Sequence, residues 1–240
     1  MGSCPFIHPF LYGDVNGNTP AVRKMPSSVQ VAFLALSSYV GRTTATAELV
    51  LDAVDAQAQQ LLLQEAATAL TYAPSLLEQL ARVQALVVYQ VIGLFDGNAH
   101  TRHLAEERRS TLCNWARQLY DSARQGLAGG SSTALPSAGS SDSSDILDGS
   151  MAAMQVLPGS DPARTWHFWI LAESIRRIWI VADAVDTIYQ AMQYGWRTPA
   201  SSIACTARHG LWQARSAAEW ERVFAPVKSA DTITEYQEFM

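Results

Sequence analysis

The sequence has few cysteines and almost no lysine. Its three cysteines, Cys4, Cys113 and Cys205, lie far apart, which argues against a secreted disulfide framework and indicates free thiols in a reducing compartment. Only two of the 17 basic residues are lysines, and the arginines reach no further than the doublets Arg108–Arg109 and Arg176–Arg177. Binding to a phosphate backbone needs clustered positive charge, and the net charge here is −5. We therefore expect no direct nucleic-acid binding by this chain.

The sequence also lacks a membrane or export signal. Its first ten residues have neither the basic start nor the continuous apolar core of a signal peptide, and Phe6 stands where an N-terminal acylation signal needs Ser or Thr. The long uncharged stretches contain Pro and Ser or are rich in Gly and Ser, which does not suit a bilayer span. We expect an intracellular, soluble chain without membrane contact.

Strand patterns are nearly absent, because no alternating apolar run is bounded by hairpin turns. Helix signals are frequent: Ser27 with Gln30 and Ser75 with Glu78 read as capping boxes, and Asp161 precedes Pro162 as an N-cap precedes the first helical residue. The sequence therefore predicts an all-α fold, an irregular multi-helix bundle with a disordered Gly/Ser-rich linker in the middle. The expected helices cover residues 28–40, 44–64, 75–95, 99–124, 161–192 and 216–224.

Helical periodicity predicts which side chains point into the core. The helix over 75–95 is apolar nearly all round and is expected to be central. The inward residues expected on its neighbours are Val29, Phe33, Leu36 and Val40 on the first helix, Leu51, Val54, Ala58 and Leu61 on the second, and Leu104, Leu112, Trp115 and Leu119 on the fourth.

Gly and Ser make up 13 of the 25 residues from 126 to 150, a composition typical of a flexible linker. The predicted organisation is an N-terminal helical half over 1–125, a linker over 126–160, a C-terminal helical half over 161–225 and a polar tail over 226–240. Ser143 and Ser144, before Asp145, could be phosphorylated, although a linker without regulatory modification is the simpler interpretation.

The helix over 161–192 carries a charged cluster among its tryptophans. Glu173 can reach Arg176 and Arg177 at positions i+3 and i+4 of a helix whose apolar groups, including Trp169, cover most of its circumference. A charge in an apolar helix is costly unless it is paired. The cluster therefore indicates a specified junction, with Glu173 holding both arginines against neighbouring helices. The alternative is an ion pair at the edge of the core.

Two motifs suggest metal chemistry. Cys4 and His8 share a C-x3-H spacing with Cys205 and His209, and together these four side chains would supply the ligands that structural zinc prefers. The two pairs are almost 200 residues apart, so the simpler interpretation is that these thiols and imidazoles are unrelated. The sequence therefore predicts no metal and no cofactor.

Asp-Ala-Val-Asp occurs at 52–55 and again at 183–186. Carboxylates at i and i+3 can hold Mg²⁺ on a diphosphate, as in isoprenoid cyclases. The first Asp is not doubled, and no partner triad is present. The simpler interpretation is that both motifs lie on the polar faces of helices and that neither contains a catalytic residue.

Several segments resemble, in order and spacing, the middle homology region of fungal zinc-finger transcription factors, a regulatory domain. The matching residues are Pro5–Phe6–Ile7–His8–Pro9 with Tyr12, residues 80–86 with Tyr89 and 94–96, Arg102, Ala105, Glu106 and Trp115, then Trp169 with residues 173–177, and finally residues 211–214 with Trp220. The resemblance implies an α-helical nuclear module that follows a DNA-binding zinc unit in that family. No six-cysteine cluster or two-Cys-two-His finger pair is present here, so the DNA-reading element is missing.

We therefore expect a nuclear transcriptional regulator that acts through other transcription regulators or a DNA-binding subunit, as a homo- or hetero-oligomer, on genes such as a specialised-metabolite cluster. The chain is then either a natural stand-alone regulator or part of a longer factor. The alternatives are a helical domain that senses a small molecule among its tryptophans and an all-α isoprenoid-type enzyme.

Overall fold

The computed structural model describes residues 4–13, 25–68, 73–128, 161–196, 205–206 and 208–225. Every regular element within these ranges is helical, which confirms the predicted all-α class. The expected linker beyond residue 128, with Ser143 and Ser144, and the expected tail after residue 225 lie outside the described residues. The helices are α1 (Ser27–Val40), α2 (Ala47–Thr68), α3 (Leu76–Asp96), α4 (Ala99–Ala128), α6 (Pro162–Tyr194) and α7 (Ala217–Phe224).

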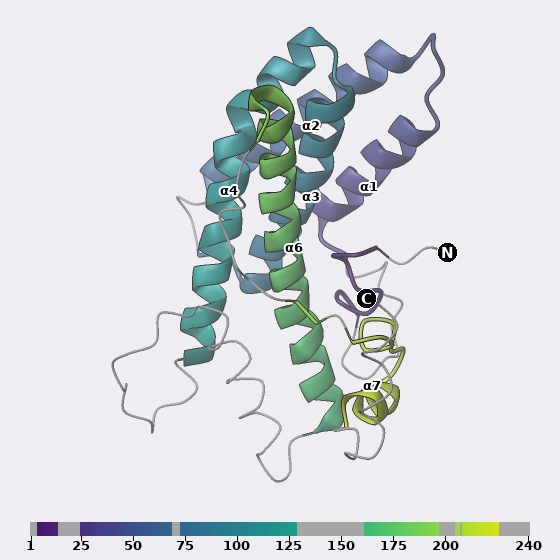
Figure 1. The fold of residues 1–240 in the computed structure, drawn as a ribbon, viewed down its shortest axis with the longest axis vertical. Helices are drawn as coiled ribbons and strands as arrows, with labels where there is room; N and C mark the ends of the chain where they lie inside the picture. Colours follow the sequence, from purple (N-terminus) through teal and green to yellow (C-terminus); the bar gives the residue numbers. More distant parts are fainter. Residues whose placement is uncertain are drawn as a thin grey trace.

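Helix α3 lies at the centre of the bundle, as its apolar composition predicts. It packs against α1, α2, α4 and α6, and Leu80, Val83 and Leu86 are fully buried. Figure 1 shows α4 and α6 running side by side along the long axis, with α1 at the outer edge of the bundle. Full burial of one such side chain stabilises the fold by about 1.5–3 kcal/mol, so α3 supplies much of the core.

Local signals set the predicted helix ends. Ser75 and Glu78 form the expected capping box at the start of α3. Asp161 accepts a hydrogen bond from the backbone N–H of Ala163 at 3.1 Å, and Gly195 ends α6 in the left-handed region at φ 92°. These caps satisfy backbone groups that a helix end leaves without partners, so the sequence predicts them well.

The predicted start of α1 is wrong in detail. The structure begins the helix at Ser27 with Pro26 as N-cap and no side-chain cap, so Ser27 and Gln30 form no capping box. Gln30 instead donates its side-chain amide to the backbone carbonyl of Met25 at 2.5 Å.

The predicted inward face of α1 is also wrong. Val29 is buried, but Phe33 and Val40 are 63% and 74% exposed, and Ala32 is the other buried residue. The physical reason is position: α1 lies at the edge of the bundle and contacts only α2 and α3 among the helices, so a single narrow stripe suffices to pack it.

The inward face of α2 is confirmed, because Leu51, Val54, Ala58 and Leu61 are all buried. On α4, Leu112, Trp115 and Leu119 are buried and Leu104 is partly buried. Helix α2 begins at Ala47 rather than 44, after a turn in which the backbone N–H of Thr43 donates to the Thr46 hydroxyl at 2.9 Å.

A single main core includes residues from both the N-terminal and the C-terminal described segments. Leu11 and Tyr12 from the N-terminal segment, α1 to α4, Ile170 and Ile175 of α6, and Trp220 of α7 belong to one buried cluster. A smaller cluster of Leu94, Ala105, Val185 and Tyr189 lies between α3, α4 and α6. The predicted domain boundaries remain a prediction, but the two described halves share this core.

No helix in the described ranges is both long and apolar enough to span a bilayer.

Candidate functional site: the Glu173 junction

Glu173 lies in the middle of α6 with its side chain fully buried. Oε2 accepts a hydrogen bond from Nε of Arg176 at 2.9 Å and lies 2.8 Å from Nη2 of the same arginine in an ion pair, and Oε1 accepts a hydrogen bond from Nε of Arg177 at 2.9 Å. These are the i+3 and i+4 neighbours that the sequence indicated. One buried carboxylate therefore pairs with two guanidinium groups, which lowers the cost of burying its own charge.

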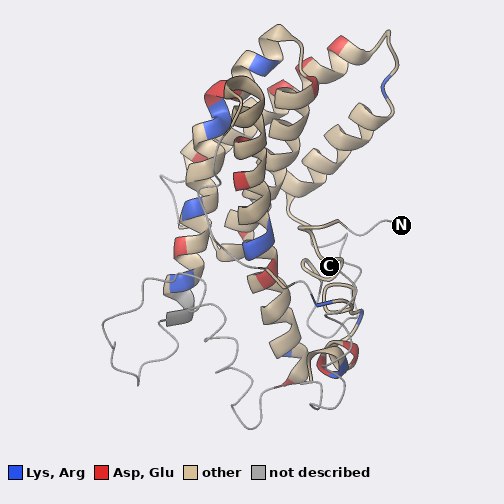
Figure 2. Cartoon of the chain, in the orientation of Figure 1, with Lys and Arg blue, Asp and Glu red and all other residues tan. Residues whose placement is uncertain are grey.

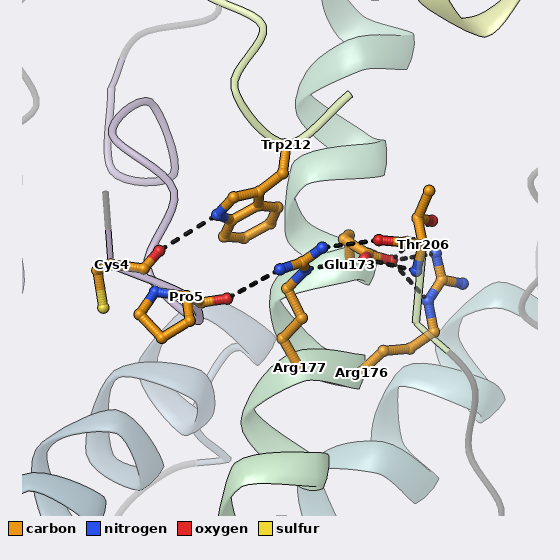
Figure 3. Close-up of polar contacts among 7 residues, drawn as sticks. All are labelled: Cys4, Pro5, Glu173, Arg176, Arg177, Thr206 and Trp212. Atoms are coloured by element: carbon orange, nitrogen blue, oxygen red, sulfur yellow. Dashed lines mark hydrogen bonds and ion pairs between the residues drawn. The ribbon is translucent and has the colours of Figure 1, made fainter. Parts of the chain in front are cut away.

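Thr206 completes the set of donors around this carboxylate. Its backbone N–H donates to Oε1 at 2.9 Å, and its hydroxyl donates to Oε2 at 3.2 Å. The Arg177 guanidinium donates in turn to the backbone carbonyls of Thr206 at 2.8 Å and Pro5 at 3.2 Å (Figure 3). Buried carboxylate oxygens need such donors, and this arrangement supplies them from α6 and from a non-helical segment.

Trp212 joins the cluster from above, as Figure 3 shows. Its ring centroid lies 4.2 Å from the Arg177 guanidinium carbon, and its indole N–H donates to the backbone carbonyl of Cys4 at 3.2 Å. We call Glu173, Arg176, Arg177, Pro5, Thr206 and Trp212 the Glu173 junction. It fastens the N-terminal segment and the segment around 205–214 to α6.

The expectation that Glu173 holds the arginines against neighbouring helices remains a prediction. Outside α6, Glu173 and Arg177 form hydrogen bonds with Thr206 and Pro5, which belong to non-helical segments. A sequence signal for them is weak, because a backbone N–H or carbonyl is present at every residue and identifies no partner.

Aromatic side chains surround the junction and fill the lower core. The Trp169 ring contacts those of Trp212 and Trp220, with centroids 6.4 and 5.7 Å apart, and the His8 ring lies edge-on to Trp212 at 5.0 Å. Trp169 is 2% exposed. These tryptophans pack against one another as core, which does not favour an effector site among them.

His8 is the one buried histidine among the described residues. Its Nδ1 accepts a hydrogen bond from the Phe10 backbone N–H at 3.2 Å, while Nε2 has no hydrogen-bond partner in the described part of the chain. Burial lowers the pKa of His8 from 6.5 to about 4. The imidazole is therefore neutral at physiological pH.

The four candidate zinc ligands do not form a site in this arrangement. His8 is buried among aromatic rings, whereas Cys205 and His209 are exposed and Cys4 is partly buried. Across the described residues, no group of three or more His, Cys, Asp or Glu side chains could hold a metal ion. The three cysteines form no disulfide bond.

The two Asp-Ala-Val-Asp motifs supply ion pairs between helices. Asp55 of α2 pairs with Arg108, and Asp186 of α6 accepts two hydrogen bonds from Arg109, from Nε at 2.8 Å and Nη2 at 2.6 Å. Consecutive helical residues point about 100° apart, so the arginine doublet of α4 reaches two different helices. The sequence did not predict these partners, because Asp55 and Asp186 lie 53 and 77 residues from their arginines.

The described part of the chain contains cavities lined by charged or aromatic residues, and two of them differ in whether they could hold a ligand. A small one of about 80 Å³ is lined by Trp179, Cys113 and Asp186, which is room for a few waters rather than a metabolite. A larger one of about 440 Å³ lies between α1, α2 and α3, beside Glu65 and Arg82. Arg82 pairs with Glu65 and is 8% exposed, and its buried Nε has no hydrogen-bond partner.

Comparison with known proteins gives one informative match. The chain is 29% identical over 225 residues to "Transcription factor gsfR2" from Penicillium aethiopicum, covering 93% of this chain and 46% of that protein. The chain thus spans about half the length of this relative. No protein-family model matches the chain. No solved structure matches it either. The similarity supports a relationship to a fungal transcription factor and a role in regulating transcription.

Proposed function

We propose that this chain is a nuclear regulatory module that controls transcription through protein contacts, while another polypeptide or segment reads the DNA. The observation that carries the proposal is the similarity to a transcription factor over 93% of this chain. The regulatory-domain resemblance in the sequence agrees with it, and in that family the target genes are commonly specialised-metabolite clusters.

The charges of the structure support indirect action on DNA. Arg108 and Arg109 pair with Asp55 and Asp186, and Arg176 and Arg177 pair with Glu173. Each arginine doublet is thus already engaged with carboxylates inside the fold. Phosphate contacts need basic side chains that are available at the surface, so these four residues are poor candidates for DNA binding.

A tethering experiment tests the proposal. The chain is fused to an unrelated DNA-binding domain, and transcription of a reporter with the matching sites is measured in fungal cells. We expect the fusion to change reporter output by severalfold in either direction relative to the DNA-binding domain alone. Unchanged output from a fusion that is folded and nuclear would contradict the proposed function.

Two further measurements test its separate parts. The purified chain is expected to leave a duplex DNA probe unshifted at physiological salt, since it offers no basic stripe. A fluorescent fusion is expected in nuclei, and strict exclusion from nuclei would count against a regulatory role. Tight, selective binding of DNA by the chain alone would overturn the division of labour between two polypeptides.

A second candidate function is favoured by the cavity beside Arg82. Its volume of about 440 Å³ lies in the range of small-ligand sites, and its lining includes the charged side chains of Glu65 and Arg82. Thermal-shift screening with pathway metabolites distinguishes this sensor from a pure interaction module. A ligand present at about 100 times its dissociation constant stabilises the fold by about 2.7 kcal/mol.

A further inference from the structure

Helices α1 and α2 form an apolar groove on the outside of the bundle. The groove has a volume of about 380 Å³. Its lining comes from both helices, includes Leu34 and Ala35 of α1 and Leu49, Val50 and Ala53 of α2, and contains no charged residue. An exposed apolar surface between two helices is unfavourable in water unless something covers it.

The two ridges of the groove are unusually exposed for leucine. Leu34 on α1 is 64% exposed, and Leu49 on α2 is 72% exposed. Both lie in well-formed helices, so the backbone beneath them is satisfied and the side chains stand on a rigid surface. Two parallel or antiparallel ridges with a groove between them are the shape that receives the apolar stripe of a third helix.

Charge distinguishes what can occupy the groove. Helix α1 has no charged residue, and the four charged residues of α2 are all acidic. Glu48 and Asp52, which directly precede the lining residues Leu49 and Ala53, are exposed and share one face of the helix at i and i+4. Figure 2 shows this pattern, with α1 free of charge and α2 marked only in red. Arg42, in the turn between the helices, is paired with Asp96.

We infer that the groove binds an amphipathic helix of another polypeptide, with an apolar stripe facing the groove and lysine or arginine beside Glu48 and Asp52. The argument is charge complementarity: an acidic rim attracts a basic helix and repels an acidic one. A second copy of this chain fits less well, because its own α1–α2 surface is apolar and acidic in the same way. The inference rests on the proposed function, because a partner that binds DNA carries clustered lysine and arginine residues.

Synthetic peptides of about five helical turns test the inference with the full chain. One carries leucine on a helical stripe and lysine elsewhere, the second has the same stripe with glutamate, and the third has the leucine–lysine composition in scrambled order. Fluorescence anisotropy measures binding of each. We expect the ordered leucine–lysine peptide to bind about tenfold or more tightly than either of the others.

Paired variants locate the binding surface. The double variant Leu34→Gln and Leu49→Gln removes one exposed apolar residue from each ridge. Its matched control is Val40→Gln with Leu63→Gln, since these side chains are 74% and 70% exposed on the same two helices but do not line the groove. We expect the first pair to weaken binding about tenfold and the control pair to change it less than about twofold. Melting curves should show both pairs folded.

Neutralising the rim tests the charge argument. Glu48→Gln with Asp52→Asn should weaken binding of the leucine–lysine peptide and reduce its dependence on salt. Glu107→Gln, at a side chain on α4 that is 63% exposed, is the control and should change neither.

Three outcomes would overturn the inference. The first is equal affinity for the lysine and glutamate peptides, and the second is unchanged peptide affinity in the Leu34→Gln with Leu49→Gln variant. The third is a dimer in analytical sedimentation that this double variant dissociates, because a second copy of the chain would then occupy the groove. Failure of the proposed function would look different. If the peptide binds through the groove but the tethered fusion does not change reporter output, the chain has a docking surface but no regulatory role.

Discussion

Glu173 shows how a single buried charge can hold distant parts of a chain together. Its carboxylate accepts hydrogen bonds from two arginines on its own helix and from Thr206, and Arg177 also donates a hydrogen bond to the backbone carbonyl of Pro5. A salt bridge of this kind adds little net stability compared with an apolar replacement of the whole cluster. Removing Glu173 is different, because both arginines would then lose the carboxylate that pairs with their charge.

We therefore predict a large loss of stability for Glu173→Ala. The buried Arg176 and the partly buried Arg177 would lose the carboxylate that pairs with them, and the Thr206 N–H would lose its acceptor, which together costs about 3–5 kcal/mol. Urea denaturation measures the change, with Glu107→Ala as the control because its side chain is 63% exposed. The control should stay within about 0.5 kcal/mol of the unmodified chain. An unchanged midpoint for Glu173→Ala would contradict the structural role of the junction.

His8 predicts a pH dependence of stability. Its pKa is about 4 in the folded chain and 6.5 in the unfolded chain, so the unfolded state binds the proton more readily. The stabilisation that comes from keeping His8 neutral in the folded chain is therefore complete above pH 6.5. As the pH falls from 6.5 toward 4, the free energy of unfolding decreases by about 3 kcal/mol. His8→Phe, which keeps an aromatic ring beside Trp212, should remove part of this loss.

The measurement compares urea unfolding of both proteins at pH 7 and pH 4.5. The gap in unfolding free energy between the two pH values should be smaller for His8→Phe than for the unmodified chain. If the two gaps are equal, His8 does not carry the pH dependence.

At the scale of elements, α4 connects two parts of the bundle. Its consecutive residues Arg108 and Arg109 pair with Asp55 of α2 and Asp186 of α6. The side chains of Arg108 and Arg109 are 9% and 18% exposed, so solvent screens these pairs less than surface pairs. The doublet therefore fixes the rotation of α4 relative to both neighbours.

A glycine sets the distance between α3 and α4. A Cβ atom at Gly93 would lie 2.8 Å from the Ala105 Cβ, and Gln90, one turn away, donates to the Ala105 carbonyl at 3.1 Å. We predict that Gly93→Ala destabilises the fold by about 1–3 kcal/mol, although alanine favours a helix over glycine by about 1 kcal/mol.

Ala105→Gly provides the rescue. The double variant Gly93→Ala with Ala105→Gly restores the space between the helices, so it should be more stable than the sum of the two single changes predicts. Thermal denaturation of all four proteins measures this coupling. Simple additivity would show that the α3–α4 contact does not depend on these two residues.

At the scale of the whole molecule, the two described halves of the chain share one core. Helix α6 packs against α3 and α4, and residues such as Ile170 and Ile175 are buried with Leu80 and Leu86 of α3. The covalent connection from 128 to 161 is therefore not what holds α6 in place.

This predicts that a cut chain stays together. A specific protease site is inserted between residues 128 and 161, the protein is cleaved, and size-exclusion chromatography follows the two pieces. We expect them to elute together at the position of the intact chain and to separate in urea. Separate elution under native conditions would show that the shared core is too weak to hold the halves without their connection.

The success of sequence reasoning differed between elements for physical reasons. The face of α2 was predicted because Leu51, Val54, Ala58 and Leu61 repeat at helical spacing and the helix packs on one side. The face of α1 was not, because an apolar stripe containing Phe33 and Val40 looks like a core face whether or not another chain covers it.

The sequence alone determined the helical class, the caps at Ser75 and Asp161, and the reach of Glu173 to Arg176 and Arg177. These depend on hydrogen bonds and side-chain pairs within about four residues, which local order fixes. Only the tertiary structure decided that Thr206 and Pro5 complete the junction, that Arg108 and Arg109 bind different helices, and that α1 and α2 leave an apolar groove open. Such contacts join residues far apart in sequence, and only the packing of the whole chain brings them together.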